Sequence, residues 1–492
     1  MSSETRVTHT HDHFREALAG LVLAIVLSSL DQNIVSTALP HIAQVLGGLP
    51  QISWVVTAFL LASTVSMPIY GKLSDMHGRR RLFIVSIAIF LVASALCGFA
   101  QDMNQLIAFR ALQGLGAGGL STLSQSAIGD LVGPRERGRY QGLFSGAQAV
   151  CTVAGPLLGG LFIAVASWRW IFFASLPVGL LALGLIVVRL PAATTVRAHR
   201  IDYAGMVLLI VSVGAVLLAL NGIASARTAF PVSPAVSAAI ALVFGALFVW
   251  WEKRAQEPIV SVGLFRNDTF AVAVAASGMM VFAMQASMVF LPLYFQMVLG
   301  KTPTASGLML LPQIAGMIVS STWGGRLSSA SGNFKRFFML GVGLETLGLA
   351  SLGISAFAGT GSVPFLFALA ILGLGTGLGM PNAIVLVQNA VPSAKLGMAT
   401  GSMSFVRSLG GAVGVAFSGF VMRLMLDGER GNRLFSRFFG HDGGSGAITG
   451  GGVGPHTADA LRLAISCSFA LGALMMAVAF MTSTRVSAEQ AH

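Results

Sequence analysis

Residues 71–81 read GKLSDMHGRRR, and residues 325–336 read GRLSSASGNFKR. The two segments share residues at matching positions: Gly71, Leu73, Ser74 and Gly78 correspond to Gly325, Leu327, Ser328 and Gly332. A second match follows in the same order, between ALQGLGAG at 111–118 and AILGLGTG at 370–377, and the same offset carries Gly138 onto Gly397 and Gly142 onto Gly401. Two matches in one order indicate an internal repeat. The chain is therefore expected to contain two related halves of parallel topology.

The sequence around the repeat is strongly apolar. Of the 492 residues, 55% are hydrophobic and 10% are charged, whereas a soluble domain has about 25% charged residues. A helix that crosses the hydrocarbon core needs roughly 20 largely apolar residues. The expected spans are 17–39, 52–71, 82–100, 105–128, 142–165, 170–190, 203–222, 233–251, 270–296, 305–323, 337–357, 363–386, 397–421 and 461–481. The predicted fold is an all-α membrane protein with 14 transmembrane helices.

The positive charges follow this arrangement. Most of the 30 Lys and Arg residues fall in loops on one side of the spans, including Arg79, Arg80, Arg81, Arg135, Arg137 and Arg139. Because cytoplasmic loops carry an excess of Lys and Arg, both termini are expected in the cytoplasm. The net charge of +12 therefore indicates membrane topology, and no nucleic-acid partner is expected. Two arginines, Arg110 and Arg407, lie within spans.

The spans and loops predict how the chain is divided. Residues 1–16 form a cytoplasmic tail, 17–190 a six-helix bundle and 191–262 a linker with two inserted helices. Residues 263–484 form the second six-helix bundle, which includes a long external loop at 422–460, and 485–492 form the other cytoplasmic tail. Cys97, Cys151 and Cys467 all lie in apolar stretches, so no disulfide framework is expected. His9, His11 and His13 are taken as part of a polar tail, and no metal site is expected.

The two halves differ in their charged residues. Ser329 stands where the first half has Asp75, and Leu369 and Leu372 stand where it has Arg110 and Gln113. This asymmetry predicts that the first bundle handles ion coupling and that the second supplies a more apolar wall.

Five segments in order resemble the major facilitator superfamily, and specifically its 14-span drug:proton antiporters of EmrB/QacA type. The segments are LDQNIVSTALP at 30–40, GKLSDMHGRRR at 71–81, RALQGLGAGG at 110–119, GAQAVCTVAGPLLGG at 146–160 and WRWIFF at 168–173. Two departures concern Ser175, where the family often has Asn, and Val415, where a Pro would repeat Pro156. The resemblance covers nearly the whole chain and implies two six-helix bundles with the substrate held between them.

Asp31 is the first candidate for proton coupling. A charged side chain in the bilayer core costs at least ~2.5 kcal/mol, so it is functional by default. Desolvation disfavours the charged form of a carboxyl, which suits Asp31 for taking up and releasing a proton. Arg110 lies at a similar depth, Gln113 shares its helix face, and the resemblance places the two spans side by side. The alternatives are a carboxyl that only stabilises packing and an arginine that is only an anchor.

The resemblance also implies a conformational latch in the loop between spans 2 and 3. Gly71, Asp75, Gly78 and Arg79 are its expected members, and Asp130 is a further candidate near the inner end of span 4. Asp75 can pair with the arginines or with a helix N-terminus. In relatives this loop holds the two bundles together in the outward-open state; the alternative is a simple positive-inside anchor.

Further candidates lie in other spans. Gly146, Gly155, Pro156, Gly159 and Gly160 form a ridge expected to pack against the other bundle and to bend the helix. Glu345 is the other acid deep in a span, a candidate second proton or substrate site even though spans of its type lie at the periphery of the fold. Gln285, Asn382, Gln388 and Asn389 are neutral candidates for lining the cavity.

The predicted function is proton-coupled export of hydrophobic, cationic drugs or toxic compounds by alternating access in a bacterial cytoplasmic (inner) membrane. No cofactor is expected, because the proton-motive force would drive transport. The expected partners are small hydrophobic substrates, protons and membrane lipids, and a periplasmic adaptor protein is the one protein partner considered. An exporter of one metabolite, lipid or siderophore is an alternative within this class. An enzyme or a non-transporting receptor is an alternative outside it, and the spans lack the paired acids or histidines that an enzyme would need.

Overall fold

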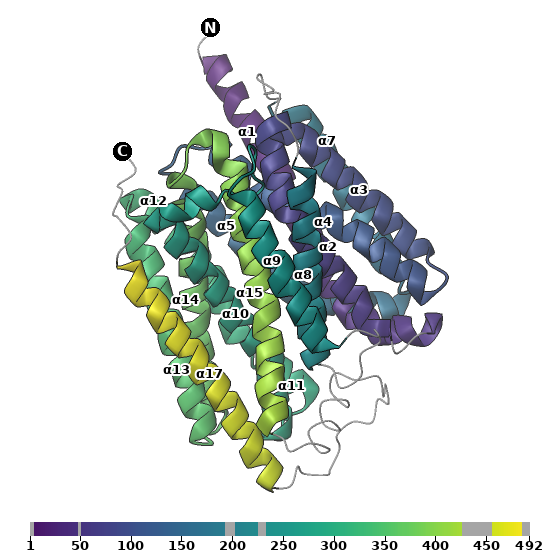
Figure 1. Ribbon diagram of the computed structural model, residues 1–492, viewed down its shortest axis with the longest axis vertical. Coiled ribbons are helices and arrows are strands. Elements are labelled where there is room, and N and C mark those ends of the chain that lie inside the picture. Colours follow the sequence, from purple (N-terminus) through teal and green to yellow (C-terminus); the bar gives the residue numbers. More distant parts are fainter. Residues whose placement is uncertain (1–3, 48–50, 192–201, 225–232, 426–454, 485–492) are drawn as a thin grey trace.

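The computed structural model describes residues 4–47, 51–191, 202–224, 233–425 and 455–484. Its regular structure in these ranges is entirely helical (Figure 1). The first bundle comprises α1 (Glu4–Leu46), α2 (Ile52–His77), α3 (Arg79–Phe99), α4 (Met103–Leu131), α5 (Arg137–Val165), α6 (Trp170–Phe173) and α7 (Ser175–Arg189). The inserted pair is α8 (Tyr203–Ala224) and α9 (Pro234–Glu252).

The second bundle repeats this arrangement. It comprises the 3-10 helix η2 (Val262–Arg266), α10 (Asp268–Met297), α11 (Pro303–Leu308), α12 (Leu311–Ser331), α13 (Phe334–Phe357), α14 (Ser362–Asn389), the 3-10 helix η3 (Ser393–Lys395), α15 (Leu396–Met425) and α17 (Pro455–Ser483). α1 begins and α17 ends at the same end of the molecule (Figure 1). We call this the basic end, because Arg79–Arg81 and the loop between α4 and α5 also lie there; the opposite end is the far end.

Thirteen helices in the described ranges are long and apolar enough to cross a membrane. The fourteenth expected span, α4, is 29 residues long but carries Arg110, three glutamines and many Gly and Ser residues, so its composition falls short. α4 packs against α1, α2, α3 and α5 and buries its polar residues inside the bundle. A helix enclosed by other helices does not need an apolar surface toward lipid.

Several helix boundaries differ from those predicted. The tail expected at 1–16 is helical from Glu4 and continues into α1, because residues 5–19 contain no Pro or Gly to end the helix. Ala174 separates α6 from α7 within the span predicted at 170–190. α15 runs to Met425 and α17 begins at Pro455, so most of the external loop predicted at 422–460 lies outside the described residues.

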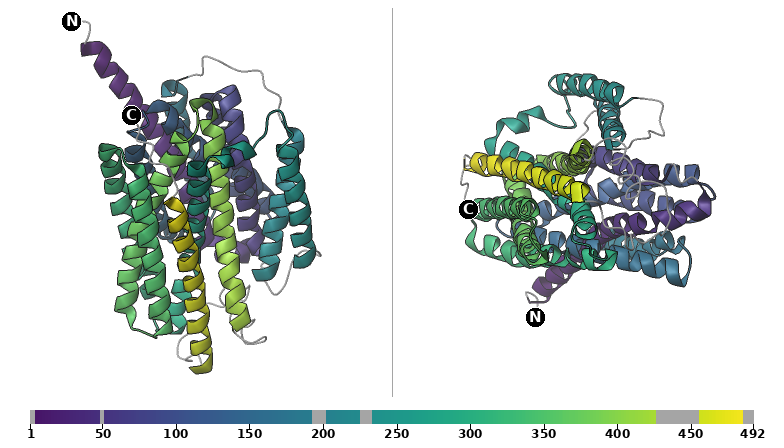
Figure 2. Two further views of the ribbon diagram at one scale, coloured as in Figure 1. Left: turned by 60° about the vertical axis from the view of Figure 1, so that its left-hand side comes forward. Right: turned by 90° about the horizontal axis from the view of Figure 1, so that it is seen from below.

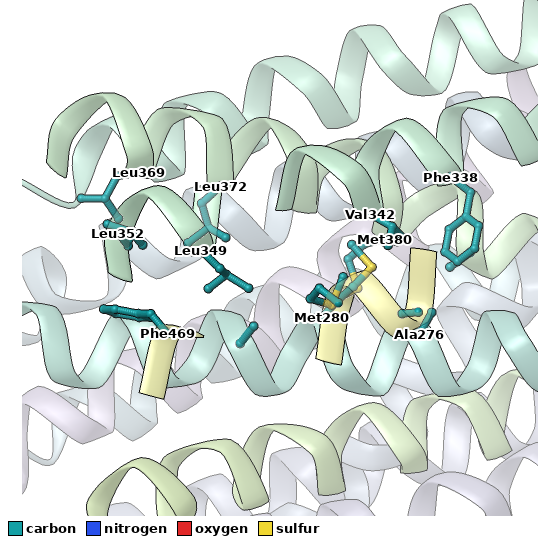
Figure 3. Close-up of a cluster of buried hydrophobic side chains, with 14 of the residues drawn as sticks. Ala276, Met280, Phe338, Val342, Leu349, Leu352, Leu369, Leu372, Met380 and Phe469 are labelled. Atoms are coloured by element: carbon teal, nitrogen blue, oxygen red, sulfur yellow. The ribbon is translucent and has the colours of Figure 1, made fainter. Parts of the chain in front are cut away.

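Each bundle has its own apolar core. In the second bundle, side chains of α10, α13, α14 and α17 interlock around Met280, Leu349, Leu372, Met380 and Phe469 (Figure 3). In the first bundle, clusters form around Phe83, Phe90 and Leu120, and around Val35, Leu106 and Trp168. The two bundles are therefore separate packing units that meet along helix seams.

Two seams join the bundles, α2 with α15 and α5 with α12. The glycines matched by the internal repeat lie at both seams: Gly71 meets Gly397 and Gly401, and Gly325 meets Gly138 and Gly142. A Cβ at Gly71 would overlap the carbonyl oxygen of Gly397 and stand 3.1 Å from the Cα of Gly401. One at Gly325 would stand 3.2 Å from the Cα of Gly142. Glycine is needed here because the helix backbones touch.

The inserted helices cover one seam only. Leu209, Val213 and Leu217 of α8 form an apolar cluster with Val65 of α2, against which Phe405 and Leu409 of α15 pack. In Figure 1 the α8–α9 pair lies in front of the boundary between α2 and α15, and Figure 2 shows it at the edge of the molecule. Lys72 also pairs with Glu257, at 2.5 Å, in the segment that follows α9. α5 and α12 instead pack against each other and α14, so the α5–α12 seam lacks this cover.

Candidate functional site

A buried polar network joins α1 and α4. Asp31 Oδ2 accepts a hydrogen bond from Arg110 NH1 at 2.6 Å, and Asp31 Oδ1 accepts one from Gln113 Nε2 at 2.9 Å. Gln113 Oε1 accepts a second bond from Arg110 NH1 at 2.7 Å. The three side chains form a closed ring in which both carboxylate oxygens have donors. The sequence therefore placed these residues together correctly.

The surroundings of this ring exclude water. Asp31 is 3% exposed, Arg110 1% and Gln113 0%. The guanidinium carbon of Arg110 lies 4.1 Å from the centre of the Phe59 ring, and Gln113 Nε2 also donates to Ser94 Oγ at 3.2 Å. An ion pair at this depth persists only when its members are well paired, since breaking such a pair costs about 3–5 kcal/mol.

Phe59 and Ser94 were not singled out from the sequence. Phe59 is one of 32 phenylalanines, and nothing in its spacing separates it from a packing residue. Ser94 bonds to Ser175 at 2.7 Å, so the departure noted at Ser175 marks a residue next to this network. That departure was the only available signal.

A second network links the bundles at the basic end. Asp75, near the end of α2, accepts hydrogen bonds from the backbone N–H groups of Gly397 at 2.9 Å and Met398 at 2.8 Å. These groups lie at the N-terminus of α15, where the helix dipole favours a negative charge. Arg79 contacts Asp75 at 3.4 Å and also pairs with Asp130. Gly78 makes the turn between α2 and α3 with φ of 86°, a conformation that favours glycine.

The other seam has a neutral counterpart of Asp75. Ser329 Oγ, at the end of α12, accepts from the backbone N–H of Arg139 at 2.8 Å, in the first turn of α5. Asp75 and Ser329 are the very pair that the internal repeat aligns. Each therefore caps the start of a helix in the opposite bundle, one with a charge and one without.

Further hydrogen bonds cross between the bundles at or near this end. Arg137 NH1 donates to Asn389 Oδ1 at 2.7 Å, and Gln388 Nε2 donates to the carbonyl oxygen of Gln125 at 2.9 Å. Gln388 and Asn389 were expected to line the cavity, but they connect α14 to the first bundle. Thr64 and Ser408 hydroxyls meet at 2.5 Å farther along the α2–α15 seam.

The glycine ridge of α5 is divided between two neighbours. Gly146 faces Thr322 of α12, as expected, but Gly155 packs against Asn33 and Gly159 against Ile34, both on α1 of the same bundle. A Cβ at Gly160 would meet nothing within 4 Å. The expectation that the whole ridge packs against the other bundle is wrong, because Gly146 and Gly155 are nine residues apart and so lie on opposite faces of α5. α5 continues as one helix through Pro156.

Glu345 and Gln285 do not join the Asp31 ring. Glu345 is fully buried on α13, and the backbone there packs against Gly375 of α14. Neither carboxylate oxygen accepts a hydrogen bond of standard geometry within the described ranges; the Thr376 hydroxyl of α14 is close to them but donates to the carbonyl oxygen of Leu372 at 2.9 Å. Gln285 is half-buried on α10, and its Cγ stands 3.2 Å from where a Cβ would lie at Gly411 of α15. The sequence prediction named Glu345 as a separate, second proton or substrate site and Gln285 as a cavity-lining residue of the second bundle, and both roles stay predictions.

The arrangement suits charge movement more than bond chemistry. Within the described ranges, no three His, Cys, Asp or Glu side chains gather where they could hold a metal ion. The Asp31 ring places one protonatable group inside the first bundle, between α1 and α4.

Comparison with known proteins agrees with this architecture. The sequence pattern of the Major Facilitator Superfamily matches residues 21–415. The chain is 36% identical over 412 residues to the multidrug transporter protein MdtP of Bacillus subtilis, covering 82% of this chain and 74% of that protein. It is 32% identical over 438 residues to multidrug resistance protein 3 of the same species, covering 88% of this chain and 84% of that protein.

A solved structure gives the same fold. The proton:xylose symporter XylE bound to 6-bromo-6-deoxy-D-glucose superimposes with a TM-score of 0.65 at 13% identity, covering 98% of this chain and 97% of that one. The fold and the match over most of the chain show that this protein is a membrane transporter, not an enzyme, and belongs to the Major Facilitator Superfamily.

Proposed function

We propose that this transporter is a proton-coupled antiporter that exports hydrophobic compounds by alternating access. The observation that carries the proposal is the buried ring of Asp31, Arg110 and Gln113. The names of the two Bacillus relatives, a multidrug transporter and a multidrug resistance protein, support export of hydrophobic compounds. No cofactor is involved: the proton-motive force supplies about 2.3 kcal/mol per elementary charge per 100 mV from its electrical part.

The ring is built so that protonation changes the contact between α1 and α4. With Asp31 ionised, both carboxylate oxygens accept hydrogen bonds and Arg110 is neutralised. A proton on Asp31 removes the negative charge and converts one acceptor into a donor, which leaves Arg110 uncompensated in an apolar site. The helices then gain by separating or by exposing Arg110 to water. Proton binding is thereby linked to the arrangement of the first bundle.

The positive-inside rule supports a cytoplasmic location for the basic end and for both termini, in a bacterial inner membrane. The bonds of Asp75, Ser329, Arg137 and Gln388 across the bundles lie toward this end. With the cytoplasmic end closed in this way, protons reach Asp31 from the opposite, outer side of the membrane under this proposal. α4 completes 14 spans under this proposal, since it runs alongside α2 and α3 within the bundle.

The test is gradient-driven transport by purified protein in liposomes, comparing the native chain with Asp31→Asn. We expect Asp31→Asn to lower pH-driven transport of fluorescent dyes and dye-induced proton movement at least tenfold, while dye binding persists. Asp102→Asn is the matched control, because Asp102 is an exposed N-cap of α4 and Asn also caps helices well. Proton movement and transport that stay at native levels in Asp31→Asn would overturn the proposal.

A further inference from the structure

Arg407 lies deep within α15. The helix begins at Leu396 at the basic end, so a rise of ~1.5 Å per residue places Arg407 about 16 Å along it. Its neighbour Ser408 meets Thr64 of α2, which is in the middle of α2. Arg407 is therefore at membrane depth, where an arginine is rare and marks a functional site by default.

The contacts of its neighbours show which way Arg407 faces. Ser408 is turned to α2, Val406 packs against Gly278 of α10, and Phe405 and Leu409 pack against the α8 cluster. The face that remains carries Arg407 and, one turn away, Ser404 and Gly411. This face is opposite α8 and lies between the faces that contact α2 and α10. Arg407 is consequently turned to the space between the two bundles.

Arg407 has no hydrogen-bond or ion-pair partner among the described residues, whereas the buried Arg110 and Arg137 both have partners. It is half-buried, so part of the side chain stays accessible. Ser404 Oγ, on the same face, is buried and also lacks a partner in the described ranges. The side chain of Gln285 reaches the neighbouring turn at Gly411. One unpaired cation and one unsatisfied hydroxyl thus share this face of α15, and Gln285 lies next to it.

The other ionisable groups at this depth do not balance its charge. Asp31 is neutralised by Arg110, and Glu345 is enclosed between α13 and α14. The described residues therefore give the space between the bundles a net positive charge, located on the second bundle. A cation would be repelled here, and an anion would be attracted.

We propose that Arg407 binds the anionic group of the exported compound, so that the substrates are amphipathic organic anions such as carboxylates or sulfonates. This rests on the proposed function and reverses the charge that the sequence led us to expect for the substrate. The guanidinium can hold a carboxylate or sulfonate through two parallel hydrogen bonds. Gln285 and Ser404 supply additional polar groups on the same side. The apolar part of the substrate then faces the less polar surfaces of the bundles.

The test uses two dyes that share a xanthene ring system, anionic fluorescein and cationic rhodamine 6G. Binding to purified protein is measured by fluorescence anisotropy with no gradient, and transport is then measured in liposomes with a pH gradient. We expect the native chain to bind and export fluorescein. Arg407→Gln should weaken fluorescein binding at least tenfold without weakening the binding of rhodamine 6G. Arg407→Lys, which keeps the positive charge, should weaken fluorescein binding less than Arg407→Gln does. Arg266→Gln, an exposed arginine in η2, is the control and should match the native chain.

The outcomes separate this inference from the proposed function. Fluorescein binding that is absent in the native chain, or equal in native and Arg407→Gln protein, overturns the role of Arg407. Proton-coupled export of rhodamine 6G but not of fluorescein would also overturn the role of Arg407, while the proposal that the protein is a proton-coupled antiporter would stand. Loss of proton coupling for both dyes, with fluorescein binding still dependent on Arg407, would overturn the antiporter but not the anion site. If Arg407→Gln does not fold, Gln285→Ala is measured in its place, with a smaller selective loss of fluorescein binding expected and an unchanged affinity counting against the site.

Discussion

A carboxyl buried at membrane depth is costly unless it is paired, and the described residues include one that is well paired and one that is not. Asp31 is paired: two donors reach its two oxygens, and the partner arginine stacks on Phe59. Glu345 accepts no hydrogen bond of standard geometry within the described ranges although it is fully buried. Two carboxyl side chains within membrane spans thus have different surroundings, and only their neighbours distinguish them.

The isolation of Glu345 leads to a prediction about stability. Glu345→Met keeps a similar volume and removes two unsatisfied oxygens from an apolar region between Val342 and Leu349. We expect the variant to unfold at a higher temperature, since an unsatisfied buried polar group costs about 1–3 kcal/mol. The midpoint of thermal unfolding in detergent checks this expectation. Asp31→Met is the control with the opposite expectation: it should unfold at a lower temperature than the native chain. Loss of transport in a well-folded Glu345→Met protein would instead indicate that Glu345 takes part in proton coupling.

Sequence reasoning worked for the residues that must be paired and failed for those that are not. Asp31 and Arg110 could be placed together because they lie at a similar depth and the family resemblance puts their spans side by side, and helix spacing put Gln113 on the same face as Arg110. Arg407 was noticed only as an arginine within a span, because its significance depends on the absence of neighbours. Gln388 and Asn389 were assigned to the cavity, since the sequence does not show that α14 ends against α4 and α5.

At the scale of helices, the two seams are built alike but capped differently. Gly71 and Gly325 allow the same close approach, while Asp75 caps α15 with a charge and Ser329 caps α5 with a hydroxyl. The glycine pairs were visible in the sequence as a repeat. The sequence did not show that Ser329 keeps the capping role of Asp75, because the change from Asp to Ser was interpreted as the loss of an ionic group. The position of α8 and α9 over one seam also required the structure, since apolar helices of that kind fit any lipid-facing surface.

The difference in caps predicts unequal effects of mutation. A charged cap interacts with a helix N-terminus more strongly than a neutral one, and charge-assisted hydrogen bonds are about twice as strong as neutral ones. Asp75→Asn should therefore open the basic end more than Ser329→Ala does. We expect thiol labelling of a cysteine placed at Thr400, which faces Gln388 between the bundles, to increase several-fold in Asp75→Asn and less than twofold in Ser329→Ala. Equal labelling in the two variants would show that the charge at Asp75 does not matter for closure.

At the scale of the whole molecule, the two bundles have separate cores and meet through backbone-close glycines and polar bonds near one end. Alternating access then requires the basic end to open while each core stays packed. Packed cores are not continuously deformable, so motion should be confined to the seams. The internal repeat predicts this arrangement, because two units related by duplication fold separately and associate through equivalent faces.

A covalent link across a seam tests whether the basic end must open. A Cβ at Gly138 would lie 2.9 Å from Ser329 Oγ, near the separation that a disulfide requires. In a Cys467→Ser background, which removes the exposed cysteine and leaves the buried Cys97 and Cys151 in place, Gly138→Cys with Ser329→Cys should cross-link under oxidation. We expect oxidation to reduce transport at least tenfold and reduction to restore it. Each single cysteine is the control and should respond to neither treatment; the Gly138→Cys control also measures the loss of transport that a side chain at this close-packed position causes by itself. Full transport by the oxidised, cross-linked protein would mean that the α5–α12 seam stays closed throughout the cycle and that the opening lies elsewhere, which would contradict rigid-body alternation of the two bundles.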